Sequence, residues 1–217
     1  MSELPASLYA AAAGLAAGLA IAAVPLWRQH RQSAWWRHLA RHDDTTGLPN
    51  RRALIGHLRR ALAQGRPVGL VMIDLDRFKT VNDTFGHATG NTLLHAVAGR
   101  LPTGVHGVAL AARLSGDEFA LIVHGDAATT QAAAHVAWQA VTATPIRLGT
   151  VTIQVTASVG YAMAHDGANP EVLLHDADVA MYHAKQRRNH VYGATPTGGA
   201  AAAPPPPHRC RDARHQP

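Results

Sequence analysis

The sequence predicts an α/β fold in which strands and helices alternate around one sheet. Apolar runs of strand length, such as residues 68–73 and 118–124, alternate with longer segments of helical character. Between two of the runs, Ser115-Gly116 supplies small residues where the chain must turn tightly, which predicts a hairpin. The apolar content of 47% is ample for a core, although much of it is alanine near the two ends.

The first half of the predicted domain is a helix, a strand and a second helix. The helix is expected at about 50–63, and the unbroken apolar run at 68–73 indicates a buried strand. That strand ends in two alternating acids, Asp74 and Asp76. A polar turn is expected next, followed by a helix from about 84 to 100.

The second half begins with the predicted hairpin and continues the alternation. Two apolar runs flank Ser115-Gly116, and the later segments switch between helical and strand character. The expected elements are strands at 107–113 and 118–124, a helix at 127–142, a strand at 151–163 and a helix at 170–186.

Two acidic clusters, each at a strand end, carry the predicted chemistry. Asp74 and Asp76 follow one buried strand, and Asp117 and Glu118 stand at the hairpin just before another. Strand ends that meet at one edge of a sheet bring such acids to a single Mg²⁺ site, the arrangement used for phosphoryl transfer on nucleotides. Acids that merely cap turns are the alternative. The presence of both clusters in one short domain favours the metal site.

Five motifs, in this order, resemble the GGDEF domain, the catalytic domain of the diguanylate cyclases. The resemblance covers about 43–192 and carries the variant signature SGDEF. The motifs are Asp43-Asp44-Thr45-Thr46-Gly47-Leu48-Pro49-Asn50-Arg51-Arg52, Asp74-Leu75-Asp76-Arg77-Phe78-Lys79, Asn82-Asp83-Thr84-Phe85-Gly86-His87, Arg113-Leu114-Ser115-Gly116-Asp117-Glu118-Phe119, and Ala157-Ser158-Val159-Gly160-Tyr161 with Ala177-Asp178-Val179-Ala180-Met181-Tyr182-His183-Ala184-Lys185.

The resemblance implies a fold and an activity. The fold is the ferredoxin-like, palm-type core of the nucleotide cyclases, a central antiparallel sheet flanked by helices. The activity is that of a bacterial signalling enzyme, a nucleotidyltransferase that condenses two GTP molecules into cyclic di-GMP and releases pyrophosphate. It implies Mg²⁺, with Mn²⁺ as an alternative, and a homodimer in which each subunit binds one GTP.

The resemblance also assigns roles at the metal centre. The metal ligands would be Asp74, the backbone carbonyl of Leu75, and Asp117. Mg²⁺ prefers hard oxygen ligands and substrate phosphates, so one or two carboxylates suffice. Catalysis is assigned to the pair Asp117 and Glu118, and the sequence does not divide metal binding and proton removal between them.

The substrate contacts implied by the resemblance lie on both sides of these acids. The backbone amides of Phe78 and Lys79 would cradle the terminal phosphates, with the Lys79 charge added. The full set is Phe78, Lys79, Asn82, His87, Asn91, Lys185 and Arg188, of which Asn82, His87 and Asn91 match base and ribose contacts and Lys185 and Arg188 match phosphate contacts. Solvated surface lysines and a helix-capping His87 are the blander alternatives.

Several positions depart from the family pattern. Asn91 stands where the family has aspartate, so one acceptor for the guanine edge is replaced by an NH₂ donor. Ser115 replaces the first glycine of the signature, a small residue that we expect the turn to tolerate. Before Arg188 the last helix is one residue shorter than usual. His106 and Ala109 replace the arginine and aspartate of the family's inhibitory site, so no such site is expected.

Composition and the two ends of the chain predict its setting. The single cysteine, Cys210, offers no disulfide framework and fits a reducing compartment. The net charge of +6 comes largely from segments beside residue 27 and in the C-terminal tail, so we expect no nucleic-acid partner. Residues 193–217 are predicted to be a disordered tail rich in proline and alanine.

The first 27 residues predict a membrane anchor, followed by a basic linker at 28–42. The segment 8–27 carries no charge and is long enough to span a bilayer. Arginines follow it and an acid precedes it, which places the catalytic domain in the cytoplasm and the protein in the inner membrane as a single-pass chain. The alternatives are a soluble Ala-rich helix and a cleaved signal peptide, which would need a basic stretch before the apolar one.

Three functions follow from these observations. The first is a diguanylate cyclase, favoured by the retained acids Asp74, Asp117 and Glu118. The second is a degenerate GGDEF domain that binds a nucleotide and regulates a partner. The third is a cyclase with relaxed base choice that accepts ATP as well as GTP. Asn91 is the residue that supports the last two.

Overall fold

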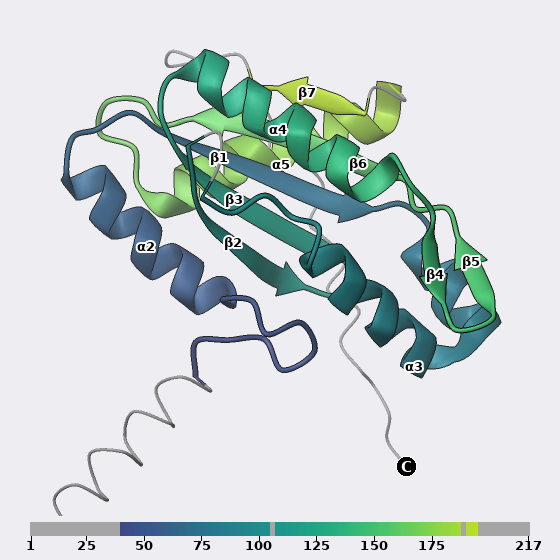
Figure 1. Ribbon diagram of the computed structural model, residues 1–217. Helices are drawn as coiled ribbons and strands as arrows, with labels where there is room; N and C mark the ends of the chain where they lie inside the picture. The colour runs from purple at the N-terminus through teal and green to yellow at the C-terminus, as the bar shows by residue number, and fades with distance from the viewer. Residues whose placement is uncertain (1–39, 105–106, 188–189, 195–217) are drawn as a thin grey trace, which may run out of the picture. The chain divides into compact units, whose positions relative to one another are not determined.

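The computed structural model describes residues 40–104, 107–187 and 190–194. Every element below belongs to the unit that begins at Asp43. Its centre is a five-stranded sheet in the order β2-β3-β1-β6-β7 (Figure 1). The strands are β1 (Val68–Leu75), β2 (Val108–Ser115), β3 (Glu118–His124), β6 (Ala157–Met163) and β7 (Val191–Gly193). All neighbours pair antiparallel except β6 and β7, which are parallel.

Two pairs of helices cover the two faces of this sheet. Helices α2 (Arg51–Ala63) and α5 (Pro170–Arg187) cover one face, and α3 (Phe78–Ala98) and α4 (Ala127–Thr142) cover the other. All eight residues of β1 are buried, because this central strand is enclosed on both faces. The result is the expected antiparallel sheet flanked by helices.

The alternation of side chains along β1 determines where its terminal acid points. Val71, Ile73 and Leu75 pack into the core under α3 and α4, whereas Leu70 and Met72 pack under α2 and α5. Successive residues of a strand face opposite sides. Asp74 therefore projects towards the face that α5 covers.

The helix predicted at 84–100 begins earlier, at Phe78, so the polar turn expected after β1 is limited to Asp76 and Arg77. Residues 79–84 are mostly polar, which favours a turn in the sequence, but they belong to the first helical segment of α3. Gly86, with φ 82° and ψ 159°, breaks α3 into two segments. Arg77 directs the chain from β1 into the first segment, and its φ of 57° is left-handed.

The strand predicted at 151–163 is two strands separated by a break. Strand β5 (Val151–Ile153) pairs with β4 (Ile146–Leu148) in a separate two-stranded sheet, and β6 begins only at Ala157. The two small strands form a hairpin next to Gly149, whose φ is 61°. Strands β4 and β7 were not predicted, because each has only three residues and is too short for a recognisable pattern.

The predicted anchor and tail lie almost wholly outside the described residues. Residues 1–39 and 195–217 are not described, and of the predicted tail Gly193 belongs to β7. Among the helices of the described ranges, none is long and apolar enough to cross a membrane.

The left-handed Arg77 predicts a stabilising substitution. Arg77→Gly should raise the free energy of unfolding by about 0.5–1 kcal/mol, because glycine adopts this backbone without the Cβ clash. The greater conformational entropy of glycine in the unfolded chain offsets only part of this stabilisation. Urea denaturation would measure it. Arg77→Ala is the matched control, since it removes the same charge but keeps the Cβ. A glycine variant no more stable than the alanine variant would contradict the argument.

Candidate active site

A cavity of about 980 Å³ opens at the C-terminal end of β1. Asp74 and Leu75 line it from β1, Asp117 from the β2–β3 hairpin, and Phe78 and Lys79 from the start of α3. On the side of α5 it is lined by Ala184 and Lys185. The cavity thus gathers one end of the central strand, a hairpin tip and the ends of two helices. We call it the β1 cavity.

Three acids of the two clusters, Asp74, Asp76 and Asp117, line this cavity. The register places Asp74 directly opposite Glu118 on β3 and opposite Ser158 on β6. The Leu75 amide donates to the backbone oxygen of Asp117 at 3.2 Å, which joins the hairpin to the end of β1. Asp74 and Asp117 therefore lie on neighbouring segments of one site.

The carboxyl group of Asp74 is held in an unusual environment. The residue is 7% exposed, and burial raises its pKa to about 6. The Lys185 ammonium, with Nζ 2.5 Å from Asp74 Oδ1, works in the opposite direction. Burial also raises the pKa of Asp117, so both predicted metal ligands carry their charge at a cost that a bound cation would offset.

Lys185 reaches Asp74 because α5 lies directly on β6. A Cβ at Gly160 would come within 2.1 Å of the Met181 backbone nitrogen, so only glycine allows this approach. Lys185 follows Met181 by one helical turn and lies on the same side of α5. The glycine of the Ala157–Tyr161 motif therefore positions the lysine.

The predicted phosphate-binding residues Phe78 and Lys79 lie at the first turn of α3. The side chain of the N-cap residue, Arg77, makes no capping hydrogen bond, so the first amides of α3 are available to an anion. Phe78 is buried, whereas the exposed Lys79 forms an ion pair with Asp83, 2.5 Å between Nζ and Oδ2. Lys79 must leave Asp83 to bind a phosphate.

The predicted base contacts lie on both segments of α3. Asn82 is in the first segment, and a Cβ at Gly90 would lie 1.9 Å from its Oδ1. This close approach places Asn82 beside the residue that precedes Asn91, so the two asparagines lie on adjoining turns. Asn91 and His87 are exposed, and His87 directly follows the break at Gly86.

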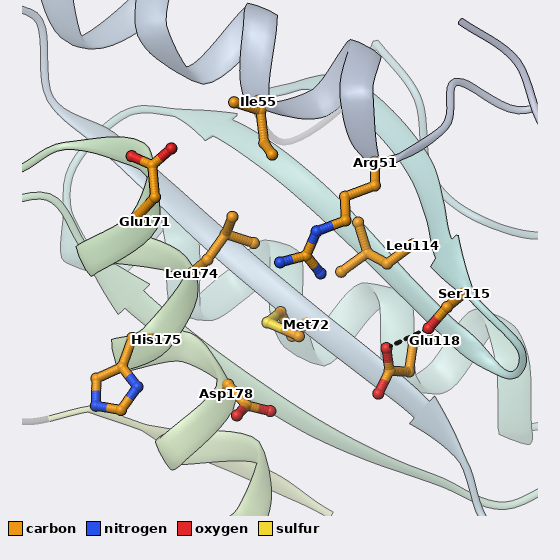
Figure 2. Close-up of a pocket in the computed structure, with 10 residues that line it drawn as sticks. All are labelled: Arg51, Ile55, Met72, Leu114, Ser115, Glu118, Glu171, Leu174, His175 and Asp178. Carbon is orange, nitrogen blue, oxygen red and sulfur yellow. Dashed lines mark hydrogen bonds between the residues drawn. The ribbon is translucent and has the colours of Figure 1, made fainter. Parts of the chain in front are cut away.

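Other predicted positions are not brought to the β1 cavity. Glu118 lines a second cavity of about 700 Å³ between α2 and α5, whereas its neighbour Asp117 lines the first. We call this second one the α2–α5 cavity, and Figure 2 shows Arg51 extending over it from α2. Arg188 and His106 lie outside the described residues, and Ala109 is exposed on β2.

Several residues that line the β1 cavity were not predicted as site residues, among them Thr156, Ser158 and His190. Ser158 Oγ donates to Asp76 Oδ1 at 2.9 Å, and the Thr156 carbonyl accepts from the Asp76 amide at 2.9 Å. His190 stacks on Trp138 with 4.8 Å between ring centroids. Ser158 stood in a quoted motif, but nothing in the sequence marked Thr156 or His190.

Arg113 fixes the hairpin that carries Asp117. Its guanidinium donates to the Gly116 carbonyl at 3.0 and 2.7 Å and to Asp43 Oδ1 at 2.8 Å. Burial opposes the charge on Asp43, but hydrogen bonds from Arg113 and Thr46 outweigh it and hold the pKa of Asp43 below its ordinary value. The N-terminal motif and the signature are thus bound to each other.

The donors of the β1 cavity suit a hard divalent cation. Within the described ranges, no three His, Cys, Asp or Glu residues are grouped so as to hold a metal by themselves. Mg²⁺ does not need such a cage, since one or two carboxylates and substrate phosphates complete its shell. Asp74 and Asp117 meet that requirement.

A family comparison agrees with this geometry. The sequence model described as the diguanylate cyclase GGDEF domain matches residues 40–190. The chain belongs to the GGDEF family. Among known proteins, diguanylate cyclase TpbB of Pseudomonas aeruginosa is 38% identical to this GGDEF domain over 168 residues, 74% of this chain and 38% of TpbB. Response regulator PleD of Caulobacter vibrioides is 40% identical over 164 residues, 71% of this chain and 36% of PleD.

Solved structures of GGDEF domains share the fold. The coiled coil and GGDEF domain of DgcB from Caulobacter crescentus, in complex with c-di-GMP, aligns with a TM-score of 0.75 and 29% identity, covering 83% of this chain and 99% of that one. The GGDEF domain of TpbB aligns with a TM-score of 0.63 and 37% identity, and the alignment covers 71% of this chain and 94% of the TpbB domain. The chain spans only 25% to 38% of the length of the first curated relatives it matches.

The raised pKa of Asp74 predicts how stability varies with pH. In metal-free protein the free energy of unfolding should fall as pH rises from about 4 to about 6, because native Asp74 keeps a proton that the unfolded chain has released. Asp74→Asn removes this contribution. Between about pH 4 and pH 6 its free energy of unfolding should therefore rise by roughly 1–3 kcal/mol relative to that of the wild type. Urea denaturation in EDTA at a series of pH values measures it.

The control for this measurement is an exposed acid remote from the cavity, Asp166→Asn. Its stability should run parallel to that of the wild type across the same pH series. If the free energies of unfolding of wild type and Asp74→Asn vary with pH in parallel, burial does not raise the pKa of Asp74.

Proposed function

We propose that this GGDEF domain is an active diguanylate cyclase that condenses two GTP molecules into cyclic di-GMP. The observation that carries the proposal is the meeting of Asp74, Asp117 and Lys185 at the end of β1. Two carboxylates for a cation, a lysine and the uncapped start of α3 are together what a metal-bound triphosphate requires. The names of TpbB and other relatives support the same activity.

Residues of the β1 cavity, together with Asn82 and Glu118, divide the work of the reaction. Asp74, the Leu75 carbonyl and Asp117 would hold Mg²⁺ or Mn²⁺, which neutralises the triphosphate and lowers the pKa of the 3′-hydroxyl. The first amides of α3, with Lys79 and Lys185, bind phosphate oxygens, and Asn82 contacts the guanine edge. Asp117 or Glu118 accepts the 3′-hydroxyl proton as the oxygen attacks the α-phosphorus.

Two domains are needed to complete the product. Each 3′-oxygen forms a bond to the α-phosphorus of the other GTP, and each attack breaks the bond to a leaving pyrophosphate. One domain holds one GTP, so a two-fold homodimer brings the pair together. Anchorage of this dimer in the cytoplasmic membrane through residues 8–27 stays a prediction from the sequence.

Product analysis of the full chain tests the activity. With GTP and Mg²⁺ the wild type should release pyrophosphate and form cyclic di-GMP, detected by chromatography and mass. Asp117→Ala should lower the rate by about 100-fold or more, because a metal ligand is lost. Asp166→Ala, an exposed acid outside the cavity, should match wild type. Bound nucleotide without product at high protein concentration would instead identify a nucleotide-binding regulatory module.

Asn91 favours a second candidate, a cyclase with relaxed base choice. It presents one acceptor and one donor where a carboxylate would present two acceptors to guanine. Asn91→Asp should therefore raise the preference for GTP over ATP by about tenfold or more, since a charged hydrogen bond contributes roughly 1.5–3 kcal/mol. Competition assays with both nucleotides measure the ratio. An identical ratio before and after the change would exclude Asn91 as the residue that selects the base.

A further inference from the structure

Ser115 places a hydroxyl group beside the acid of the signature that does not line the β1 cavity. It is the last residue of β2 and lies opposite Glu118 in the register of the hairpin. Its Oγ donates to Glu118 Oε2 at 2.8 Å, as the dashed line in Figure 2 shows. Within the described part of the chain, this is the one hydrogen bond that a side chain donates to Glu118.

The backbone at Ser115 leaves its side chain available for such a role. Of the two small residues of the hairpin, only Gly116 has a left-handed backbone, with φ 44°. Ser115 lies in extended strand, where any residue fits. The first small position of this signature therefore does not need glycine for its conformation, and a side chain can be added there without strain.

Glu118 needs a partner because its neighbours repel it. It lies directly across from Asp74 and follows Asp117 in sequence. Like charges facing each other across two strands are unfavourable, and a half-buried carboxylate without a donor has several rotamers open to it. The Ser115 hydroxyl occupies Oε2 and leaves Oε1 for a nucleotide hydroxyl or a water molecule.

We propose that Ser115 is a positioning residue that holds the Glu118 carboxylate in one orientation for nucleotide condensation. The inference rests on the proposed cyclase activity. A glycine at this position would offer no such donor. Glu118, oriented in this way opposite Asp74 and next to Asp117, acts on the reacting hydroxyl while Asp117 faces the metal.

Substitutions that separate the hydroxyl from the backbone test this role. Ser115→Ala in the full chain should lower kcat about 3- to 10-fold, with KM for GTP and the thermal midpoint nearly unchanged, because binding and fold do not use the hydroxyl. Ser115→Gly should lose as much, and Ser115→Thr, which keeps the hydroxyl, should recover most of the rate. An unchanged kcat in Ser115→Ala, or no recovery in Ser115→Thr, would overturn the inference.

A double-mutant cycle shows whether Ser115 acts through Glu118. Glu118→Asp shortens the side chain and withdraws the carboxylate from the hydroxyl, so adding Ser115→Ala to it should change kcat less than twofold, a limit set by the usual error of additivity. If the kcat of the double variant falls by the product of the two single-variant losses, the positioning role is overturned. A wild type that forms no product defeats the proposed cyclase activity, and the inference with it. If the wild type is active and the Ser115 variants have the same kcat, only the inference about Ser115 is overturned.

Discussion

Asp74 is buried at the end of β1 with Glu118 opposite it and Asp117 beside it. Gathering three carboxylates at one buried strand end is unfavourable unless cations compensate them. The Lys185 ammonium supplies one positive charge, and the fold provides for it through the contact of α5 with Gly160. The remaining excess of negative charge is what makes the site ready for a divalent cation and the nucleotide that accompanies it.

Arg113 plays the corresponding structural role on the other side of the site. One guanidinium binds the hairpin carbonyl of Gly116 and the carboxylate of Asp43, with little exposure to solvent. An arginine can do this because its planar group presents several donors in fixed directions. The tip that carries Asp117 is therefore fixed to the segment through which the chain enters the domain.

Much of the fold followed from the sequence because its main signals are local. The buried run at 68–73 and the hairpin at Ser115-Gly116 predicted the centre of the sheet, and Asp74 and Asp117 of the paired acids line the β1 cavity. The start of α3 was missed because a non-glycine residue, Arg77, takes the left-handed turn and polar residues form the first helical segment. No local sequence pattern predicts the left-handed backbone of Arg77 or the helical conformation of the polar residues that follow it.

The finer arrangement of the site depends on contacts between distant segments. The two acids are adjacent in the sequence, but Asp117 lies in the hairpin turn and Glu118 begins β3, and they line different cavities. Lys185 was assigned through family resemblance alone, since only packing of α5 on β6 shows which carboxylate it meets. His190 reaches the β1 cavity from a short stretch near the end of the described chain, where composition gives no signal.

Gly160 shows how a residue without a side chain can control chemistry it never touches. The α5 backbone rests on its Cα, and the next turn of that helix carries the lysine that binds Asp74. A single added methyl group would lift the helix and carry the ammonium away from its carboxylate. In a comprehensive mutational survey, position 160 would therefore resemble an active-site residue, although Gly160 does not line the β1 cavity and acts only through the position of α5.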